Sequence, residues 1–280
     1  MIVAANSDEL KVALNSLSSN GSNTGFVPTM GALHKGHLQL INRARKENNV
    51  VVCSVFVNPT QFNDKNDLDN YPRTIENDIT LLEKAGCDVV FLPQVNDMYP
   101  DGVKVLNINL NGLETNMEGA YRPGHFQGMI TIVDKLLKTV NARNNYFGEK
   151  DFQQLAIIKH YVKQFSLPFN IIGCDTVREE DGLAYSSRNV LLTPEERVAA
   201  PVIYKILMQC SDLKKSKNVE ALKAWVKEQI DNTMILKVQY ISFVDAESLK
   251  ELNAWTDSEN CRACIAVLTS GTRLIDNVAV

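Results

Sequence analysis

The chain passes from a strand-like run into a helix over the stretch Phe26-Val27-Pro28-Thr29-Met30-Gly31-Ala32-Leu33-His34-Lys35-Gly36-His37. Gly31 and Gly36 let the backbone turn tightly and let a ligand approach without a Cβ in the way. His34 and His37 lie three residues apart, so they share one face of the first helical turn. A helix N-terminus presents unpaired N–H groups and a partial positive charge, which favour phosphate. The stretch therefore predicts a phosphate-binding turn, and a pair of surface histidines beside a loop is the simpler alternative.

Composition limits the class of protein. The 280 residues are 45% hydrophobic, which is enough for one large or two ordinary domains with a substantial core. The formal net charge of −4 and the lack of a basic cluster argue against a nucleic-acid partner. The N-terminus has no basic residues before an apolar core, and apolar runs such as 50–57 are short. We therefore predict no secretory signal and no membrane span, in a reduced, cytoplasmic protein.

Six cysteines are scattered along the chain. Cys261 and Cys264 have the spacing of a redox or metal motif, but an apolar run follows at once and no second ligand pair is near. We predict that the cysteines act as small hydrophobic residues and that the protein holds no metal through them.

Alternating patterns predict an α/β fold. The run 50–57 is continuously apolar and rich in β-branched residues, which is typical of a parallel strand buried on both faces. Further strands are expected at 25–29, 88–93, 103–110, 145–147 and 168–174. Helices are expected at 7–17, 36–47, 129–140 and 152–165, and one that starts at 71–74 runs to 85. Leu38 and Ile75 are among the side chains predicted to face the sheet. The alternation predicts a doubly wound parallel sheet.

The pattern changes in the last third of the chain. Helices at 194–213 and 218–230 precede strand-like runs at 236–245, 261–269 and 273–276. We predict a catalytic α/β domain over 1–177 and a second, smaller α+β domain over 178–280. Polar stretches at 21–24 and 64–70 predict loops.

Several other turns carry groups suited to ligands. Asn58 and Gln61 follow the buried strand, at the sheet edge where ligands bind, and Pro59 stiffens their turn. An ordinary turn with exposed amides is the alternative. Lys150 supplies a mobile charge suited to polyphosphate, while Asp151 either caps the next helix or binds a ribose hydroxyl.

The charged stretch 178–189 contains Ser186, Ser187 and Arg188 in a row, which are good donors for phosphate oxygens. A solvated linker between domains is the alternative reading, and a ligand-binding hinge satisfies both.

These motifs together closely resemble one family, pantothenate synthetase (pantoate–β-alanine ligase) of the His-x-Gly-His nucleotidyltransferase superfamily. The resemblance spans nearly the whole chain. It rests on Pro28-Thr-Met-Gly-Ala-Leu-His-Lys-Gly-His37, Val57-Asn-Pro-Thr-Gln-Phe62, Tyr71-Pro-Arg73, Gly124-His-Phe-Gln-Gly128, Phe147-Gly-Glu-Lys-Asp151 with Gln153 and Gln154, and Asp181-Gly-Leu-Ala-Tyr-Ser-Ser-Arg-Asn189. Many nucleotidyltransferases share the first motif, whereas the ordered combination is specific.

The resemblance implies a reaction and an architecture. ATP, (R)-pantoate and β-alanine would give pantothenate, AMP and pyrophosphate through a pantoyl adenylate. A Rossmann-like domain would carry the active site and the C-terminal domain would act as a lid. Mg²⁺ is expected as the companion of ATP, and a homodimer is expected for the family.

The resemblance also assigns residues. His37 is the expected proton donor, and His34, Lys150 and Arg188 complete the predicted catalytic set. Gln61 and Gln154 are expected to hold pantoate, with Gln61 also at the β-alanine site. Tyr185 stands where Met or Leu is usual, so only its backbone contact is carried over. The expected ATP-binding residues are Met30, Gly31, Ala32, Leu33, His34, Lys35, Gly36, His37, Gly148, Glu149, Lys150, Asp151, Val177, Tyr185, Ser186, Ser187 and Arg188.

Two other functions use the same motifs. A nucleotidyltransferase acting on a phosphorylated acceptor would need further cationic residues, whereas Asn58, Gln61 and Gln154 are neutral amides suited to a hydroxy acid. A nucleotide-binding protein without turnover would bind ATP and release no pyrophosphate.

Overall fold

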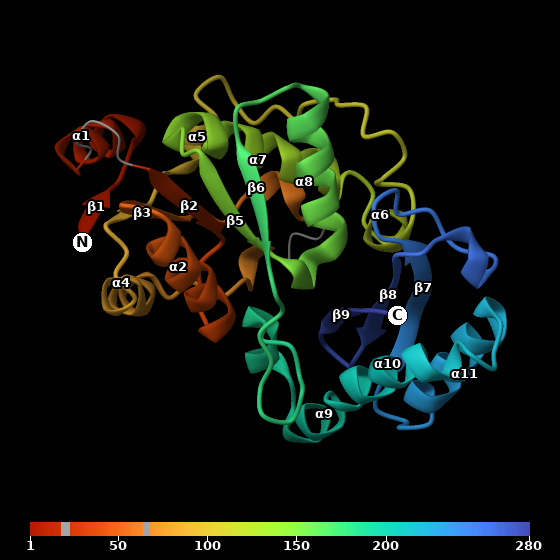
Figure 1. Cartoon of the computed structure of the whole chain (residues 1–280). Coiled ribbons are helices and arrows are strands. Elements are labelled where there is room, and N and C mark those ends of the chain that lie inside the picture. Colours follow the sequence, from red (N-terminus) through yellow and green to blue (C-terminus); the bar gives the residue numbers. More distant parts are fainter. Residues whose placement is uncertain (18–22, 64–67) are drawn as a thin grey trace. The chain divides into compact units, whose positions relative to one another are not determined.

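The computed structural model describes residues 1–17, 23–63 and 68–280 (Figure 1). The loops predicted at 21–24 and 64–70 lie partly outside these residues. The described chain forms two compact units. The first unit comprises residues 1–110, 122–149 and 157–175, and the second comprises 111–121, 150–156 and 176–280. Each unit is therefore assembled from three separate segments of the chain.

The first unit contains a six-stranded, wholly parallel sheet in the order β1-β4-β3-β2-β5-β6. Its strands are β1 (Ile2–Ala4), β2 (Thr24–Thr29), β3 (Val50–Val55), β4 (Val89–Phe91), β5 (Asn144–Gly148) and β6 (Asn170–Cys174). The chain moves outward from β2 through β3 to β4, and then returns to place β5 on the other side of β2. The predicted α/β class is confirmed. Strand β1, which pairs Ile2 with Val89, was not predicted.

Burial on both faces explains why the sheet is parallel. All six residues of β3 are buried, as the continuous apolar run predicts. Val51 and Cys53 pack on one face with Leu40, Ile41 and Ala44 of α2 (Lys35–Glu47). The other helices of the first unit include α1 (Ser7–Leu17), α4 (Ile75–Lys84), α5 (Val95–Met98), α7 (His125–Val140) and most of α8 (Phe152–Gln164).

For two side chains, the predicted position on the sheet-facing side of a helix is wrong. Leu38 is half-buried and Leu40 takes its place in the core. Ile75 is 48% exposed, while Asp78 on the same helix is 1% exposed. Helix α4 therefore buries the acidic side chain of Asp78, beside Leu82, where the buried face was predicted to carry Ile75.

The strand predicted at 103–110 is absent from the described residues. Two polar side chains of α7 take the place of a neighbouring strand: Thr131 Oγ1 accepts from the Leu106 N–H at 2.9 Å. Gln127 accepts from the Ile108 N–H at 3.0 Å and donates to its carbonyl at 2.7 Å. The segment predicted from the alternating pattern is therefore bonded to side chains of α7 rather than to the backbone of a neighbouring strand. Helix α7 itself begins at His125, four residues before the predicted start.

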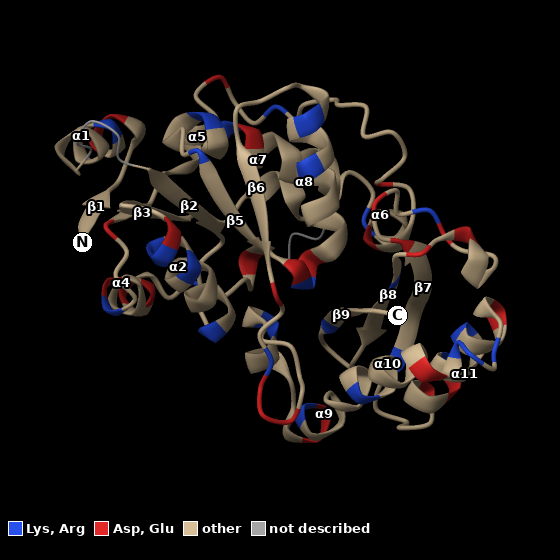
Figure 2. Cartoon of the chain, in the orientation of Figure 1, with Lys and Arg blue, Asp and Glu red and all other residues tan. Residues whose placement is uncertain are grey.

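The second unit contains an antiparallel sheet in the order β7-β8-β9. Its strands are β7 (Lys237–Asp245), β8 (Cys261–Leu268) and β9 (Arg273–Ala279), and its helices include α6 (Met117–Tyr121), α9 (Pro194–Ala199), α10 (Val202–Leu213) and α11 (Val219–Asp231). The α+β prediction is confirmed, although Pro201 divides the expected helix 194–213. Acidic and basic residues are interspersed along α11 (Figure 2).

None of the described helices is both long enough and apolar enough to cross a membrane. Cys261 and Cys264 lie buried in β8, and burial raises the pKa of the Cys264 thiol to about 12. Both therefore pack as small hydrophobic residues.

Candidate active site

The strand order places a switch point between β2 and β5, where the direction of winding reverses. In open parallel sheets, ligands bind at the carboxyl ends of the strands beside such a point. Here β2 ends at Thr29 and leads into the histidine turn, residues 30–37. Strand β5 ends at Gly148 and leads into Glu149. The structure thus brings the histidine turn and the predicted ATP-binding residues Gly148 and Glu149 to one edge of one sheet.

The histidine turn has a left-handed backbone at two successive residues. Gly31 has φ +82° and Ala32 has φ +49°. A Cβ on Gly31 would lie 2.9 Å from Val55 Cγ1 and 3.0 Å from Asp78 Oδ2. Glycine is therefore required at this position by both conformation and space.

The inward-facing Asp78 of α4 holds this turn. Its carboxylate accepts hydrogen bonds from the backbone N–H groups of Ala32 at 2.9 Å and Leu33 at 2.8 Å, and from the Thr74 hydroxyl at 3.1 Å. Asp78 lies in none of the motifs from which the site was predicted. The available signal was an acid four residues before Leu82, on the apolar face of the predicted helix.

His34 and His37 cap the start of α2. The Nδ1 atom of His34 accepts from the Gly36 N–H at 3.1 Å, and that of His37 accepts from the His34 N–H at 3.4 Å. The two rings stack with their centroids 4.0 Å apart. Because each Nδ1 accepts a hydrogen bond, each neutral ring carries its proton on Nε2. The capping arrangement therefore selects the tautomer that can donate from Nε2.

Gln61 lies next to the histidine turn. It ends η1 (Pro59–Gln61), is 8% exposed, and places Nε2 3.0 Å from Met30 Sδ. Its Oε1 accepts from Asn58 Nδ2 at 3.2 Å, which orients the amide. Asn58 is itself 1% exposed and accepts from the Tyr99 hydroxyl at 2.7 Å. The amides are thus buried and held, so the alternative of an exposed turn is wrong.

Helix α7 packs against η1 and supports it. His125 Nδ1 lies 2.7 Å from the Gln61 carbonyl, and its Nε2 lies 3.2 Å from Arg122 Nη1. A Cβ on Gly128 would lie 2.0 Å from the Thr60 carbonyl oxygen. Gly128, the last residue of the motif 124–128, is therefore a point where α7 and η1 approach each other closely.

The second unit carries the remaining predicted residues. Lys150 has an 18% exposed side chain, with Nζ 4.0 Å from the half-exposed Asp151 carboxylate. Gln154 is half-buried, whereas Gln153 is buried and bonded to the 113–118 segment.

The serine loop, residues 177–188, closes on itself. The Tyr185 N–H donates to the Val177 carbonyl at 3.0 Å, and Arg178 pairs with Ala184 in an antiparallel bridge. Ser186 Oγ accepts from the Arg188 N–H at 3.3 Å and caps η3 (Ser187–Leu191). Local hydrogen bonds therefore give this segment a defined structure.

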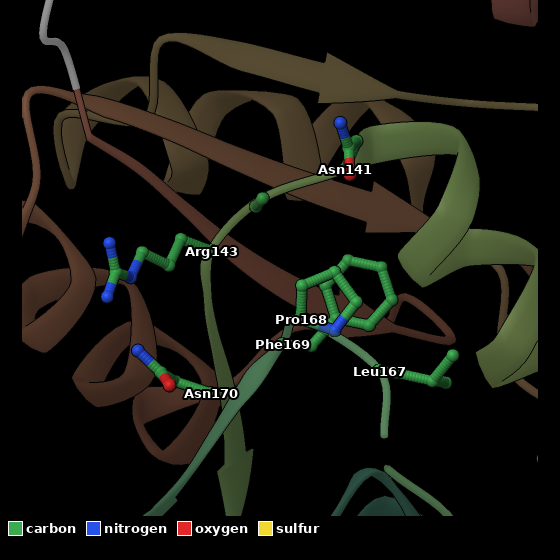
Figure 3. A pocket seen from close by; sticks show the side chains of 7 residues that line it. Asn141, Arg143, Leu167, Pro168, Phe169 and Asn170 are labelled. Atoms are coloured by element: carbon green, nitrogen blue, oxygen red, sulfur yellow. The ribbon is translucent and has the colours of Figure 1, made fainter. Parts of the chain in front are cut away.

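A separate pocket of about 490 Å³ lies in the first unit (Figure 3). Its lining comprises Asn141, Ala142, Arg143, Leu167, Pro168, Phe169 and Asn170. These residues precede β5 and enter β6, so the pocket is at the amino edge of the sheet. It lies opposite the edge that carries the histidine turn.

Comparison with known proteins identifies the family. The family model of pantoate-beta-alanine ligase matches residues 2–279. The chain belongs to the pantoate-beta-alanine ligase family. It is 48% identical to a pantothenate synthetase of Porphyromonas gingivalis, over 91% of this chain and 90% of that protein.

Solved structures of ligases from this family have the same fold as this chain. Pantothenate synthetase from Thermus thermophilus matches with a TM-score of 0.91 and 41% identity, covering 99% of each chain. The ligase from Francisella tularensis, complexed with beta-gamma ATP and beta-alanine, matches with a TM-score of 0.84 and 41% identity over 100% of this chain and 97% of that one. The predicted activity, ATP-driven ligation of pantoate to β-alanine, is thereby confirmed.

Proposed function

We propose that this ligase works through a pantoyl adenylate, with the residues predicted from the sequence in the roles given there. The observation that supports this most strongly is the histidine turn at the sheet's switch point, where Met30 contacts Gln61. ATP-binding and pantoate-binding candidates are therefore neighbours within the first unit.

The first step joins pantoate to the nucleotide. A pantoate carboxylate oxygen attacks the α-phosphorus of ATP, the bond to the bridging oxygen breaks, and pyrophosphate leaves. Negative charge accumulates on the phosphate oxygens, so donors fixed in advance stabilise the transition state. The Nε2–H groups of His34 and His37 are such donors. Lys150, Ser186, Ser187 and Arg188 are proposed to hold the departing pyrophosphate, and Asp151 the ribose.

Gln61 is suited to the acyl substrate. Because Asn58 donates to its Oε1, its Nε2–H side faces the histidine turn and can donate to a pantoate oxygen. In the second step the β-alanine amine attacks the acyl carbon, the bond to AMP breaks, and the amine loses a proton. Neutral amides at this position favour a hydroxy acid over a phosphorylated acceptor.

The remaining ATP contacts are proposed for residues 30–37, Gly148, Glu149, Val177 and Tyr185, with Gln154 as the second pantoate ligand. We propose that Mg²⁺ arrives as part of the substrate, MgATP. Among the described residues, no group of three His, Cys, Asp or Glu side chains could hold a metal by itself. Mg²⁺ commonly binds through phosphates with few protein ligands.

A cytoplasmic location, a homodimer and a lid role for the C-terminal domain (178–280) are proposed from the family resemblance. Sedimentation of the purified protein across a range of concentrations tests the oligomeric state directly.

Product release tests the reaction itself. Pyrophosphate should appear in one burst with ATP and pantoate alone, and AMP should accumulate with turnover only when β-alanine is added. His37→Ala should slow the burst by about 10²-fold or more, as expected for loss of a transition-state donor. ATP binding without any pantoate-dependent pyrophosphate would refute the proposal and favour a nucleotide-binding protein without turnover.

A further inference from the structure

Two consecutive residues of β9, Asp276 and Asn277, each contact a different predicted phosphate-binding segment of the second unit. Both side chains are buried, at 6% and 4% exposure. Neither residue belongs to a motif from which the function was predicted. Successive strand residues point to opposite faces, so one strand can support two segments.

Asn277 holds the lysine turn, residues 150–151. Its Nδ2 donates to the main-chain carbonyl of Lys150 at 2.9 Å, across 127 residues of sequence. Its Oδ1 accepts from Arg262 Nε at 2.7 Å. The Arg262 guanidinium in turn covers the Phe152 ring at 4.4 Å. The backbone is thus held at Lys150, and the helix that follows is held at Phe152. Together these contacts fix the position of the backbone from which the Lys150 side chain extends.

Asp276 holds the base of the serine loop. Its carboxylate accepts from both terminal nitrogens of Arg178, at 2.6 and 2.9 Å. Arg178 also donates to the Gly182 carbonyl at 3.2 Å and stacks on the Tyr204 ring at 3.6 Å. A two-pronged, poorly solvated ion pair fixes the orientation of Arg178 as well as its position.

We propose that Asp276 and Asn277 are positioning residues that give the lysine turn and the serine loop a common support. This inference rests on the proposed function, in which both segments hold the triphosphate. The two residues act through Lys150 and through the loop that carries Ser186, Ser187 and Arg188, without touching the nucleotide. Donors for a transition state must be held within about half an ångström to be effective, and one strand behind both segments supplies that constraint.

Asn277→Asp tests the lysine turn with almost no change in shape. The variant keeps the acceptor for Arg262 but replaces the donor to the Lys150 carbonyl with an oxygen that repels it. We expect kcat/KM for ATP, measured by pyrophosphate release, to fall about tenfold or more, which corresponds to about 1.4 kcal/mol or more of lost transition-state stabilisation. The KM for pantoate should change less than twofold.

Asp276→Asn tests the serine loop, because the amide leaves one Arg178 nitrogen opposed by a donor. Asp245→Asn is the matched control in the same unit: Asp245 accepts from the Ser248 and Ser258 hydroxyls at 2.7 and 2.6 Å. The control should lower the melting temperature without changing kcat/KM for ATP. Asn277→Ser provides a smaller variant if Asn277→Asp fails to fold.

The outcomes separate the two proposals. If the unaltered enzyme releases no pyrophosphate with pantoate, the proposed function fails. If it is active, and both β9 variants retain its kcat/KM for ATP, the positioning role is refuted. The role is also refuted if the loss of kcat/KM for ATP in each variant follows its loss of melting temperature and the KM for pantoate rises by the same factor.

Discussion

At the scale of the residue, the histidine turn depends on an acid outside every predicted motif. Asp78 accepts three hydrogen bonds, two of them from backbone N–H groups of Ala32 and Leu33. Those N–H groups consequently donate to the protein's own carboxylate. We interpret the turn as a preorganised support for the two imidazoles, with the imidazoles as the donors to substrate.

Asp78→Asn should therefore impair catalysis, although the two side chains are almost the same size. The amide has one acceptor oxygen, and its NH₂ group would face an N–H of the turn. We expect kcat/KM for ATP to fall about tenfold, and the free energy of unfolding to fall by about 1–3 kcal/mol for the unsatisfied buried group. Steady-state kinetics and urea unfolding measure the two effects.

Asp134→Asn is the control for that variant. Asp134 is also a buried acid of the first unit, bonded to the Tyr161 hydroxyl at 2.7 Å and ion-paired with Lys138. It should lose stability with unchanged kinetics. Equal kinetic losses in the two variants would show that Asp78 acts only on stability.

At the scale of the element, η1 is held between its own amides and α7. Asn58 Nδ2 and Thr60 Oγ1 both donate to the Gly128 carbonyl, at 3.2 and 3.1 Å. The helix approaches so closely because residue 128 has no side chain. The orientation of Gln61 is therefore decided by an element that lies 64 or more residues further along the chain.

Gly128→Ala should displace η1, because the new Cβ would overlap the Thr60 carbonyl. We expect pantoate binding to weaken about tenfold or more, with ATP binding less affected, and stability to fall by about 1–3 kcal/mol from overpacking. Calorimetric titration with each substrate measures the difference. Gly271→Ala, where a Cβ would meet nothing within 4 Å, should be silent. A variant that binds pantoate normally would contradict this role for Gly128.

The start of α9 provides a pH-dependent element. Glu196 accepts from the Ser270 hydroxyl and N–H and from the Thr193 N–H, and these hydrogen bonds lower its pKa from 4.5 to about 2. A lowered pKa in the folded state adds stability above pH 4.5, and that stability is lost as the pH falls toward 2.

Glu196→Gln should remove this dependence. The difference in unfolding free energy between the unaltered protein and the variant should be constant above about pH 5.5. It should shrink between pH 4.5 and 2, with a limiting slope of about 1.4 kcal/mol per pH unit. Urea unfolding at several pH values measures it, and a difference that does not vary with pH would contradict the assignment.

At the scale of the whole molecule, the second unit takes in chain segments from well before residue 178. Glu118 of α6 is 8% exposed, forms two hydrogen bonds with Arg273 at 2.6 Å, and accepts from the Tyr240 hydroxyl at 2.8 Å. Lys150 and Phe152 likewise contact residues of β9 and β8. These segments therefore need the C-terminal sheet to bury their polar groups.

A fragment of residues 1–177 should consequently lose cooperative unfolding. It retains Glu118 without Arg273 and Tyr240, so the Glu118 carboxylate loses these three hydrogen bonds. Thermal unfolding followed by near-ultraviolet circular dichroism measures this, with full-length Glu118→Gln as the control for the ion pair alone. A sharp transition in the fragment would show that residues 1–177 fold independently.

The order of residues along the chain was enough to predict the secondary structure of most of the chain, the α/β class, the family and its activity. These follow from periodicity and from motifs such as the histidine turn, which are readable over a few residues. It failed where burial overrode pattern, as at Ile75 and Asp78 on α4, and at the extended segment 103–110.

The residues that support the candidate site could be found only from the folded chain. Asp78 lies 46 residues from Ala32, Gly128 lies 68 from Thr60, and Asn277 lies 127 from Lys150. No local pattern encodes such a pair, because each contact exists only after strands and helices have packed. The groups proposed to meet the substrates are local and readable, whereas the groups that hold them in place are distant in sequence and emerge from packing.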